Sequence, residues 1–271
     1  MATHGTKAIV AWNLLTAVFM SGPYMTARAT SIVAVRTPID VSIAADSCGT
    51  FGADDHECRN VCKIYKVGDY FLGVAGMDKD NPRNFSIAQI FMDGAVGQGT
   101  VKQKIAVAEN ALTSGIRDEA AWLKGNSPKD FAKITNPNAP AVSIVVIGID
   151  DGVPFAMQRD FRIVIDSGSI RVDIPKRTGC PGRDCPTGLK GFFLGQIDAI
   201  TRVVSDGFRI SDSSSTARSL VQLEVSARAE GVGPPIDVLR LTAKGVEGNQ
   251  KSGCPDTIQP SKNVLHPKVK Q

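Results

Sequence analysis

Short apolar runs rich in β-branched residues alternate with turn residues along the first part of the chain. Residues 30–36 and 41–45 flank a turn at 37–40, and residues 63–67 and 70–75 flank Gly68-Asp69. Runs of this kind that are separated by a few turn residues predict β-hairpins. We therefore expect four strands in close succession, two by two, with Asp46 at the end of the second strand.

The pattern changes after the second hairpin. Apolar residues recur mostly at three- and four-residue spacing over residues 83–123, which predicts two helices separated near residues 94–99. Further along the chain we expect a connection at 127–140, a strand at 141–148, a turn at 150–152, a strand at 155–165, a loop-rich segment at 167–190, helices within 192–205 and 214–229, and a last strand at 236–242.

This order of strands, helices, strands, helices and strand predicts an α+β fold. Two antiparallel sheets stacked between helix layers would bury the apolar face of every element. The βαβα alternation of a Rossmann fold is missing, and neither a G-x-G-x-x-G motif nor a P-loop occurs at a strand–helix turn. The sequence therefore gives no support to nucleotide binding.

Residues 1–29 have the features of a secretory signal peptide. Lys7 precedes an apolar run at 8–20, a helix-breaking Ser-Gly-Pro follows, and Ala27-Arg28-Ala29 is a signal-peptidase site. The run is shorter than the roughly 20 residues of a membrane span. We expect signal peptidase to cut after Ala29 and the mature protein to be periplasmic or secreted. The alternatives are an uncleaved membrane anchor and a buried N-terminal helix.

Composition and charge place few further limits on the function. The 271 residues are 42% hydrophobic and 21% charged, which is ordinary for a globular protein. The net charge of +4 becomes +2 without Lys7 and Arg28, too little to indicate a nucleic-acid or membrane partner. We expect one domain at 30–247 and a polar, Lys-rich tail at 248–271 that is flexible.

The cysteines predict disulfides. Six lie after residue 29: Cys48, Cys58, Cys62, Cys180, Cys185 and Cys254. An even number in an exported chain indicates a disulfide framework, in which Cys180 and Cys185 could close a small loop while the pairing of the other four stays open. A metal site at residues 54–62 is a weaker alternative because the paired ligand spacing is missing. We expect no metal and no cofactor.

Histidine is scarce, and this directs attention to Thr30. The chain has only His4, His56 and His266, so chemistry that needs a buried catalytic histidine is poorly supported. A free N-terminal threonine needs none, because its hydroxyl is the nucleophile and its own α-amine, with a reference pKa of about 7.7–8.0, is the base. Cleavage after Ala29 would create such a residue, so export and activation would be one event. Cys48 is a weaker nucleophile candidate, since disulfide pairing is its more probable fate.

Two charged residues can complete this unit. Asp46 ends the strand that pairs with the Thr30 strand, and Lys63 begins the next hairpin, so all three residues can meet at one edge of a sheet. Each of them alone is more often a turn residue or a solvated surface residue. A catalytic interpretation of these residues comes from the family resemblance described next.

Several segments resemble the proteasome β subunits and their bacterial relatives, which are N-terminal nucleophile (Ntn) hydrolases. They are Thr30-Ser-Ile-Val-Ala-Val, Val41 to Thr50 with its Ala-Ala-Asp, Cys62-Lys63-Ile64, Tyr70 to Gly76, Gly148 to Gly152, and Gly233 to Val238. The resemblance covers about residues 30–247. It implies a four-layer αββα sandwich, a threonine-type peptidase or amidohydrolase, a peptide or amide substrate, and a homo-oligomeric ring.

The resemblance also implies site roles. Thr30 would be the nucleophile, Lys63 would favour its alkoxide, Asp46 would pair with Lys63, and the Gly76 amide would donate to the oxyanion. The sequence departs from the family at four points. Ala29 replaces the usual Gly; Lys63 comes one residue late, which leaves Lys66 as an alternative; Leu194 to Asp198 lacks the family's Ser; and the region around Glu230 lacks another. A non-catalytic Ntn-fold binding or scaffold protein is therefore the second hypothesis.

Overall fold

The computed structural model describes residues 30–49, 58–80, 83–183, 185, 190–206, 212–229 and 231–249. The predicted signal peptide, nearly all of the predicted tail, His56, Glu230 and Cys254 lie outside these residues. Within them, no helix is long and apolar enough to span a membrane.

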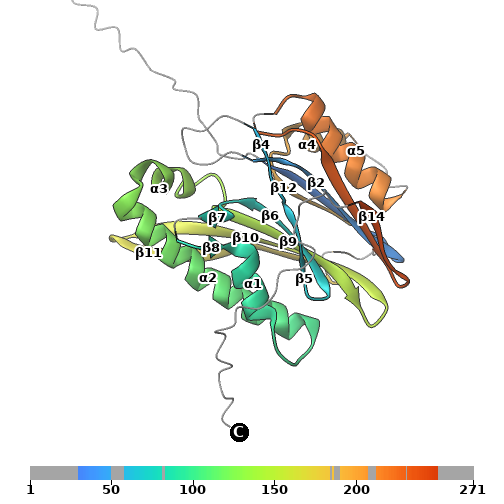
Figure 1. The fold of residues 1–271 in the computed structure, drawn as a ribbon, viewed down its shortest axis with the longest axis horizontal. Coiled ribbons are helices and arrows are strands. Elements are labelled where there is room, and N and C mark those ends of the chain that lie inside the picture. The colour runs from blue at the N-terminus through green and yellow to red at the C-terminus, as the bar shows by residue number, and fades with distance from the viewer. Residues whose placement is uncertain are drawn as a thin grey trace, which may run out of the picture.

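Two five-stranded sheets, in which all neighbouring strands are antiparallel, form the centre of the fold (Figure 1). The first sheet has the order β12 (Lys190–Gly195), β1 (Ser31–Arg36), β2 (Asp40–Asp46), β13 (Ile236–Thr242), β14 (Gly245–Asn249). The second has the order β11 (Ser169–Cys180), β10 (Val153–Asp166), β9 (Val142–Asp150), β6 (Tyr70–Gly76), β5 (Ile64–Val67). Two short pairs are added: β3 (Cys48–Gly49) with β4 (Arg59–Asn60), and β7 (Lys79–Asp80) with β8 (Phe85–Ser86).

The described residues contain five helices: α1 (Ile87–Ala95), α2 (Val101–Asn126), α3 (Pro128–Ile134), α4 (Asp198–Ser205) and α5 (Ser213–Ser226). Local signals set their beginnings. The Ser86 side chain accepts from the Gln89 amide before α1, and Thr100 and Gln103 form a capping box before α2. At Gly94 a side chain would collide with the α2 backbone, so this glycine lets α1 and α2 approach closely.

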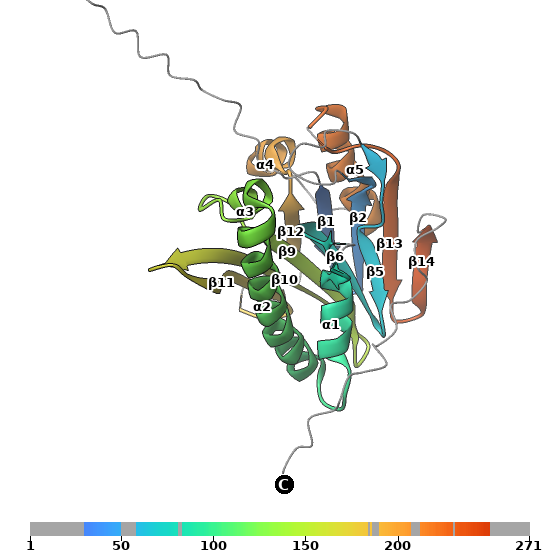
Figure 2. The same cartoon turned by 60° about the vertical axis from the view of Figure 1, so that its left-hand side comes forward.

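Three apolar clusters fix how these elements pack. One lies between the sheets and joins Ile32 and Ile43 of the first sheet to Phe71 and Val145 of the second. Another joins the second sheet to α1 and α2, and the third joins the first sheet to α4 and α5. Figure 2 shows the helices on the outer sides of the two sheets. Strands β1 and β2 are consequently buried on both faces, which explains their nearly unbroken apolar sequence.

The expected α+β class is confirmed at the level of a mixed fold with antiparallel sheets and helices. The hairpins at β1–β2 and β5–β6, the two helices α1 and α2, the β9–β10 turn and strand β13 were all predicted correctly. At that turn Asp151 and Gly152 both have positive φ, as a two-residue hairpin of this kind requires.

Four predictions of secondary structure were wrong. The segment 167–190 is mostly strand, since β11 pairs with β10 at the edge of the second sheet, where its polar residues face solvent. Residues 192–195, where we expected the beginning of a helix, belong to strand β12 because they pair with β1, and α4 begins only at Asp198. The expected connection at 127–140 contains α3, and β14 follows the strand that we expected to be last.

Candidate active site

Thr30 lies directly before β1, and Asp46 is the last residue of the neighbouring strand β2. Antiparallel pairing of Ile32 with Ala45 brings these two strand ends together. The backbone amide of Ser31 donates to Oδ1 of Asp46 at 2.7 Å, so the carboxylate lies beside the peptide bond between Thr30 and Ser31. Both residues are largely enclosed: Thr30 is 7% exposed and Asp46 is fully buried.

The Asp46 carboxylate connects four segments of the chain. Oδ1 accepts from the Ser31 amide and, at 2.8 Å, from Nζ of Lys63. Oδ2 accepts from the amide of Cys48 at 3.1 Å and from the amide of Gly233 at 3.2 Å. Four donors around one carboxylate compensate for the loss of its hydration.

Lys63 lies directly before β5 and is 4% exposed. It forms the ion pair with Asp46, which places Lys63, and not Lys66, beside the Thr30–Ser31 peptide. Burial lowers the pKa of Lys63 and raises the pKa of Asp46, while the attraction between them acts against both shifts. The result is an enclosed cation whose proton is held less tightly than that of a surface lysine.

Gly76 ends β6 and turns the backbone with a φ of +94°. A Cβ at this position would lie 2.3 Å from the carbonyl oxygen of Ala141, so no side chain fits there. Glycine is therefore required both by the backbone conformation and by the close approach of the neighbouring strand.

The segment after β12 also holds Thr30, and sequence reasoning missed this. The Gln196 amide donates to the carbonyl oxygen of Thr30 at 2.6 Å. Gly195 has a φ of +80°, and a Cβ there would lie 2.0 Å from that same oxygen. Gly195, at the end of the short apolar run Phe192–Leu194, was the available signal. Its importance depends on the pairing of β12 with β1, which is distant in the sequence.

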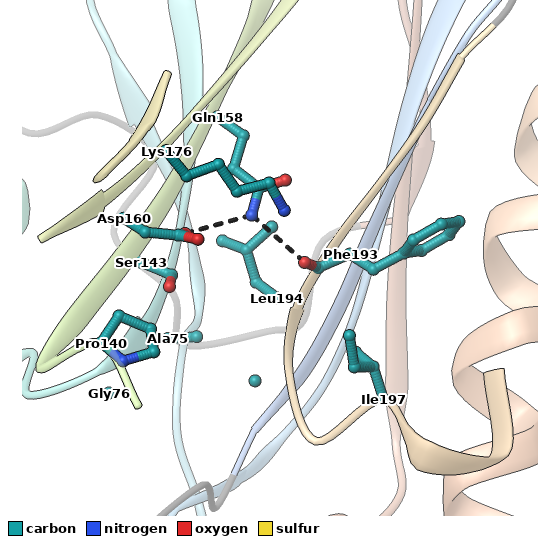
Figure 3. A pocket seen from close by; sticks show the side chains of 11 residues that line it. Ala75, Gly76, Pro140, Ser143, Gln158, Asp160, Lys176, Phe193, Leu194 and Ile197 are labelled. Atoms are coloured by element: carbon teal, nitrogen blue, oxygen red, sulfur yellow. Dashed lines mark hydrogen bonds between the residues drawn. The ribbon is translucent and has the colours of Figure 1, made fainter. Parts of the chain in front are cut away.

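A cavity of about 130 Å³ lies between the sheets and is lined by both Gly76 and Gly195 (Figure 3). Its other lining residues are Ala75, Pro140, Ser143, Gln158, Asp160, Lys176, Phe193, Leu194 and Ile197. Because Gly195 contacts Thr30 and Gly76 is the candidate oxyanion donor, the cavity lies next to the candidate site.

A second buried polar contact lies close to Lys63. The Tyr65 hydroxyl is 2.6 Å from the carbonyl oxygen of Cys62 and 2.5 Å from Oδ2 of Asp78. The Tyr65 hydroxyl donates its one proton to Asp78, with the Cys62 carbonyl oxygen as a second acceptor nearby. Burial raises the pKa of Asp78, while the hydrogen bond from Tyr65 and the charges of Lys79 and Lys63 act against this shift.

Two disulfides lie within the described residues. Cys48 is bonded to Cys58, so Cys48 is not a free thiol nucleophile and Cys58 is not available as a metal ligand. The expected small loop is present, since Cys180 is bonded to Cys185. Two such pairs are compatible with a periplasmic or extracellular location.

Comparisons with known proteins were made by sequence and by structure. No protein-family model matches the chain, and no curated protein matches it. The chain is similar in structure to a (Gly-1) mutant of Anbu from Hyphomicrobium sp. strain MC1. The two share 15% sequence identity with a TM-score of 0.49, over 82% of this chain and 85% of that one. At this level the likeness assigns no role to any residue.

Proposed function

We propose that this protein is an exported N-terminal-threonine hydrolase of the Ntn type, with a four-layer αββα sandwich, which cleaves a peptide or amide substrate. One observation carries the proposal. The buried Lys63–Asp46 ion pair lies against the peptide bond that joins Thr30 to Ser31. A cation at this place would stabilise the alkoxide form of the Thr30 hydroxyl. The enclosed Thr30 and the neighbouring cavity support it further.

The proposed reaction begins when signal peptidase releases the α-amine of Thr30. This amine takes the hydroxyl proton as the hydroxyl oxygen attacks the substrate carbonyl carbon, and Lys63 stabilises the negative charge on the attacking oxygen. The Gly76 amide donates to the oxyanion of the tetrahedral intermediate. The proton then passes to the leaving amine, an acyl ester on Thr30 remains, and water hydrolyses the ester.

Mass spectrometry of the exported protein tests this proposal. We expect the mature chain to begin at Thr30 and to gain the mass of one inhibitor at Thr30 after treatment with an electrophilic peptide. Thr30→Ala should abolish both labelling and turnover, whereas Thr30→Ser, which keeps a hydroxyl, should retain part of both. A mature chain that begins elsewhere, or a fully active Thr30→Ala variant, would exclude the mechanism.

A non-catalytic Ntn-fold binding protein is the second candidate. One observation favours it: Gly195 and Gln196 hold the Thr30 carbonyl where the resembled family has a serine. In this case the mature chain would still begin at Thr30, but no electrophilic peptide would label it.

A further inference from the structure

The cavity beside the candidate site has a polar lining on one side. Gln158 and Asp160 come from β10, and Lys176 comes from β11, directly across the ladder from Asp160. The opposite wall is the apolar end of β12 together with Ile197. A group that enters the cavity therefore meets charged and amide side chains on the second sheet only.

The hydrogen bonds of Gln158 determine what the cavity offers. Its side chain is 2% exposed, and its Nε2 donates to Oδ1 of Asp160 at 3.1 Å and to the carbonyl oxygen of Phe193 at 3.3 Å (Figure 3). A carboxamide has two N–H groups, so both are used. Apart from the Lys176 amine, the remaining polar atoms of the lining on this side are the acceptors Oε1 of Gln158 and Oδ2 of Asp160, and the Ser143 hydroxyl, which can donate or accept.

Lys176 adds one donor of opposite charge. Its side chain is exposed, and within the described part of the chain its amine has no ion pair within 4.0 Å, Asp160 included. The lining thus combines one carboxylate and one ammonium that do not neutralise each other by contact. It has no net charge, and it presents acceptors and a donor together.

A substrate held at Thr30 would enter this cavity with a side chain, and the lining selects among side-chain types. A cationic group would meet Lys176, an anionic group would meet Asp160, and an apolar group would leave polar atoms without hydrogen bonds. A carboxamide satisfies both polarities, since its N–H groups donate to the acceptors of Gln158 and Asp160 while its carbonyl accepts from Lys176.

We propose that the cavity between β10 and β12 is a substrate pocket that binds a carboxamide side chain, that of glutamine or asparagine. The proposal rests on the proposed function for its substrate. The preference depends on the net charge of the lining. Removing the carboxylate should therefore favour an anionic substrate side chain, and removing the ammonium should favour a cationic one.

Rates of Thr30 labelling by matched peptide electrophiles test the proposal. The peptides carry glutamine, glutamate, lysine or glycine at the residue attached to the electrophile. In the unaltered protein, the glutamine peptide should react roughly tenfold faster than the glutamate or lysine peptide, because it forms about one more net hydrogen bond in the pocket. Asp160→Asn should shift the preference towards glutamate, and Lys176→Gln should shift it towards lysine. Because Lys176 is exposed, the second variant has little reason to misfold.

Two controls separate the pocket from the chemistry. Arg171→Gln changes an exposed charge on the same strand outside the cavity and should leave the ranking unchanged. The glycine electrophile carries no side chain to fill the pocket, so its rate in each variant is the reference by which the other three rates are divided. Equal rates for all four peptides, or a ranking that neither charge change alters, would overturn the pocket.

If no electrophile labels Thr30, the proposed function fails and the pocket is decided by binding. N-acetyl-glutamine amide, N-acetyl-glutamate amide and N-acetyl-lysine amide are then titrated calorimetrically into the purified protein. Tighter binding of the glutamine compound, lost in Lys176→Gln, supports the pocket. Equal binding of all three compounds, or binding of none, overturns it.

Discussion

Replacing Asp46 with alanine removes the group on which the candidate site is assembled. The change leaves the buried Lys63 ammonium without its carboxylate, and it deprives the amides of Ser31, Cys48 and Gly233 of their acceptor. Breaking a buried ion pair from one side costs about 3–5 kcal/mol. Each orphaned buried amide costs about 1–3 kcal/mol more, unless water enters.

We therefore expect Asp46→Ala to lower the free energy of unfolding by at least about 3 kcal/mol, a large part of the roughly 5–15 kcal/mol that a domain has. Lys63→Met should cost less, because Asp46 then keeps three backbone donors. The double variant should cost less than the sum of the two, because neither charge is then left alone.

Urea unfolding at pH 7 without reductant, followed by circular dichroism, measures these energies with the disulfides intact. Asp118→Ala removes an exposed carboxylate on α2 and should change stability by no more than about 0.5 kcal/mol. The reasoning would be refuted if Asp46→Ala cost less than about 1 kcal/mol, or if the effects of the Asp46 and Lys63 variants were simply additive.

Three further predictions concern the glycine beside Thr30, the buried carboxyl of Asp78 and the assembly of the protein. Gly195→Ala should abolish Thr30 labelling, because its Cβ would displace the Thr30 carbonyl. Gly68→Ala is also at positive φ but in open space, so it should label normally and cost about 1 kcal/mol. Mass spectrometry compares the two variants. Burial raises the pKa of Asp78, so protonation of this carboxyl adds stability to the folded protein. This stability is present below about pH 4 and is lost as the pH rises through the folded-state pKa. Asp78→Asn should remove the loss, which urea unfolding from pH 4 to 8 measures. The resemblance to the proteasome β subunits implies a homo-oligomeric ring, which predicts a particle mass that is a multiple of the chain mass. Sedimentation equilibrium that shows a monomer would exclude it.

The sequence by itself determined the parts of the fold that depend on neighbouring residues. The β1–β2 and β5–β6 hairpins have apolar runs with turn residues between them, and α1 and α2 have helical spacing with caps at their beginnings. Thr30, Asp46 and Lys63 could be named because each lies at the beginning or end of a predicted strand, whereas Gly76 was named only from the resemblance to the proteasome β subunits. Their catalytic roles remain predictions until Thr30 is labelled.

Only the tertiary structure decided which residues surround these positions. Strand β12 resembled the start of a helix until its pairing with β1 was known, and that pairing brings Gly195 and Gln196 to Thr30 across more than 160 residues. The polar edge strand β11 places Lys176 opposite Asp160, which no local pattern indicates. The physical reason is that the type of a residue determines which kind of partner stabilises it, apolar or oppositely charged. The long-range pairing of the chain determines which residue becomes that partner.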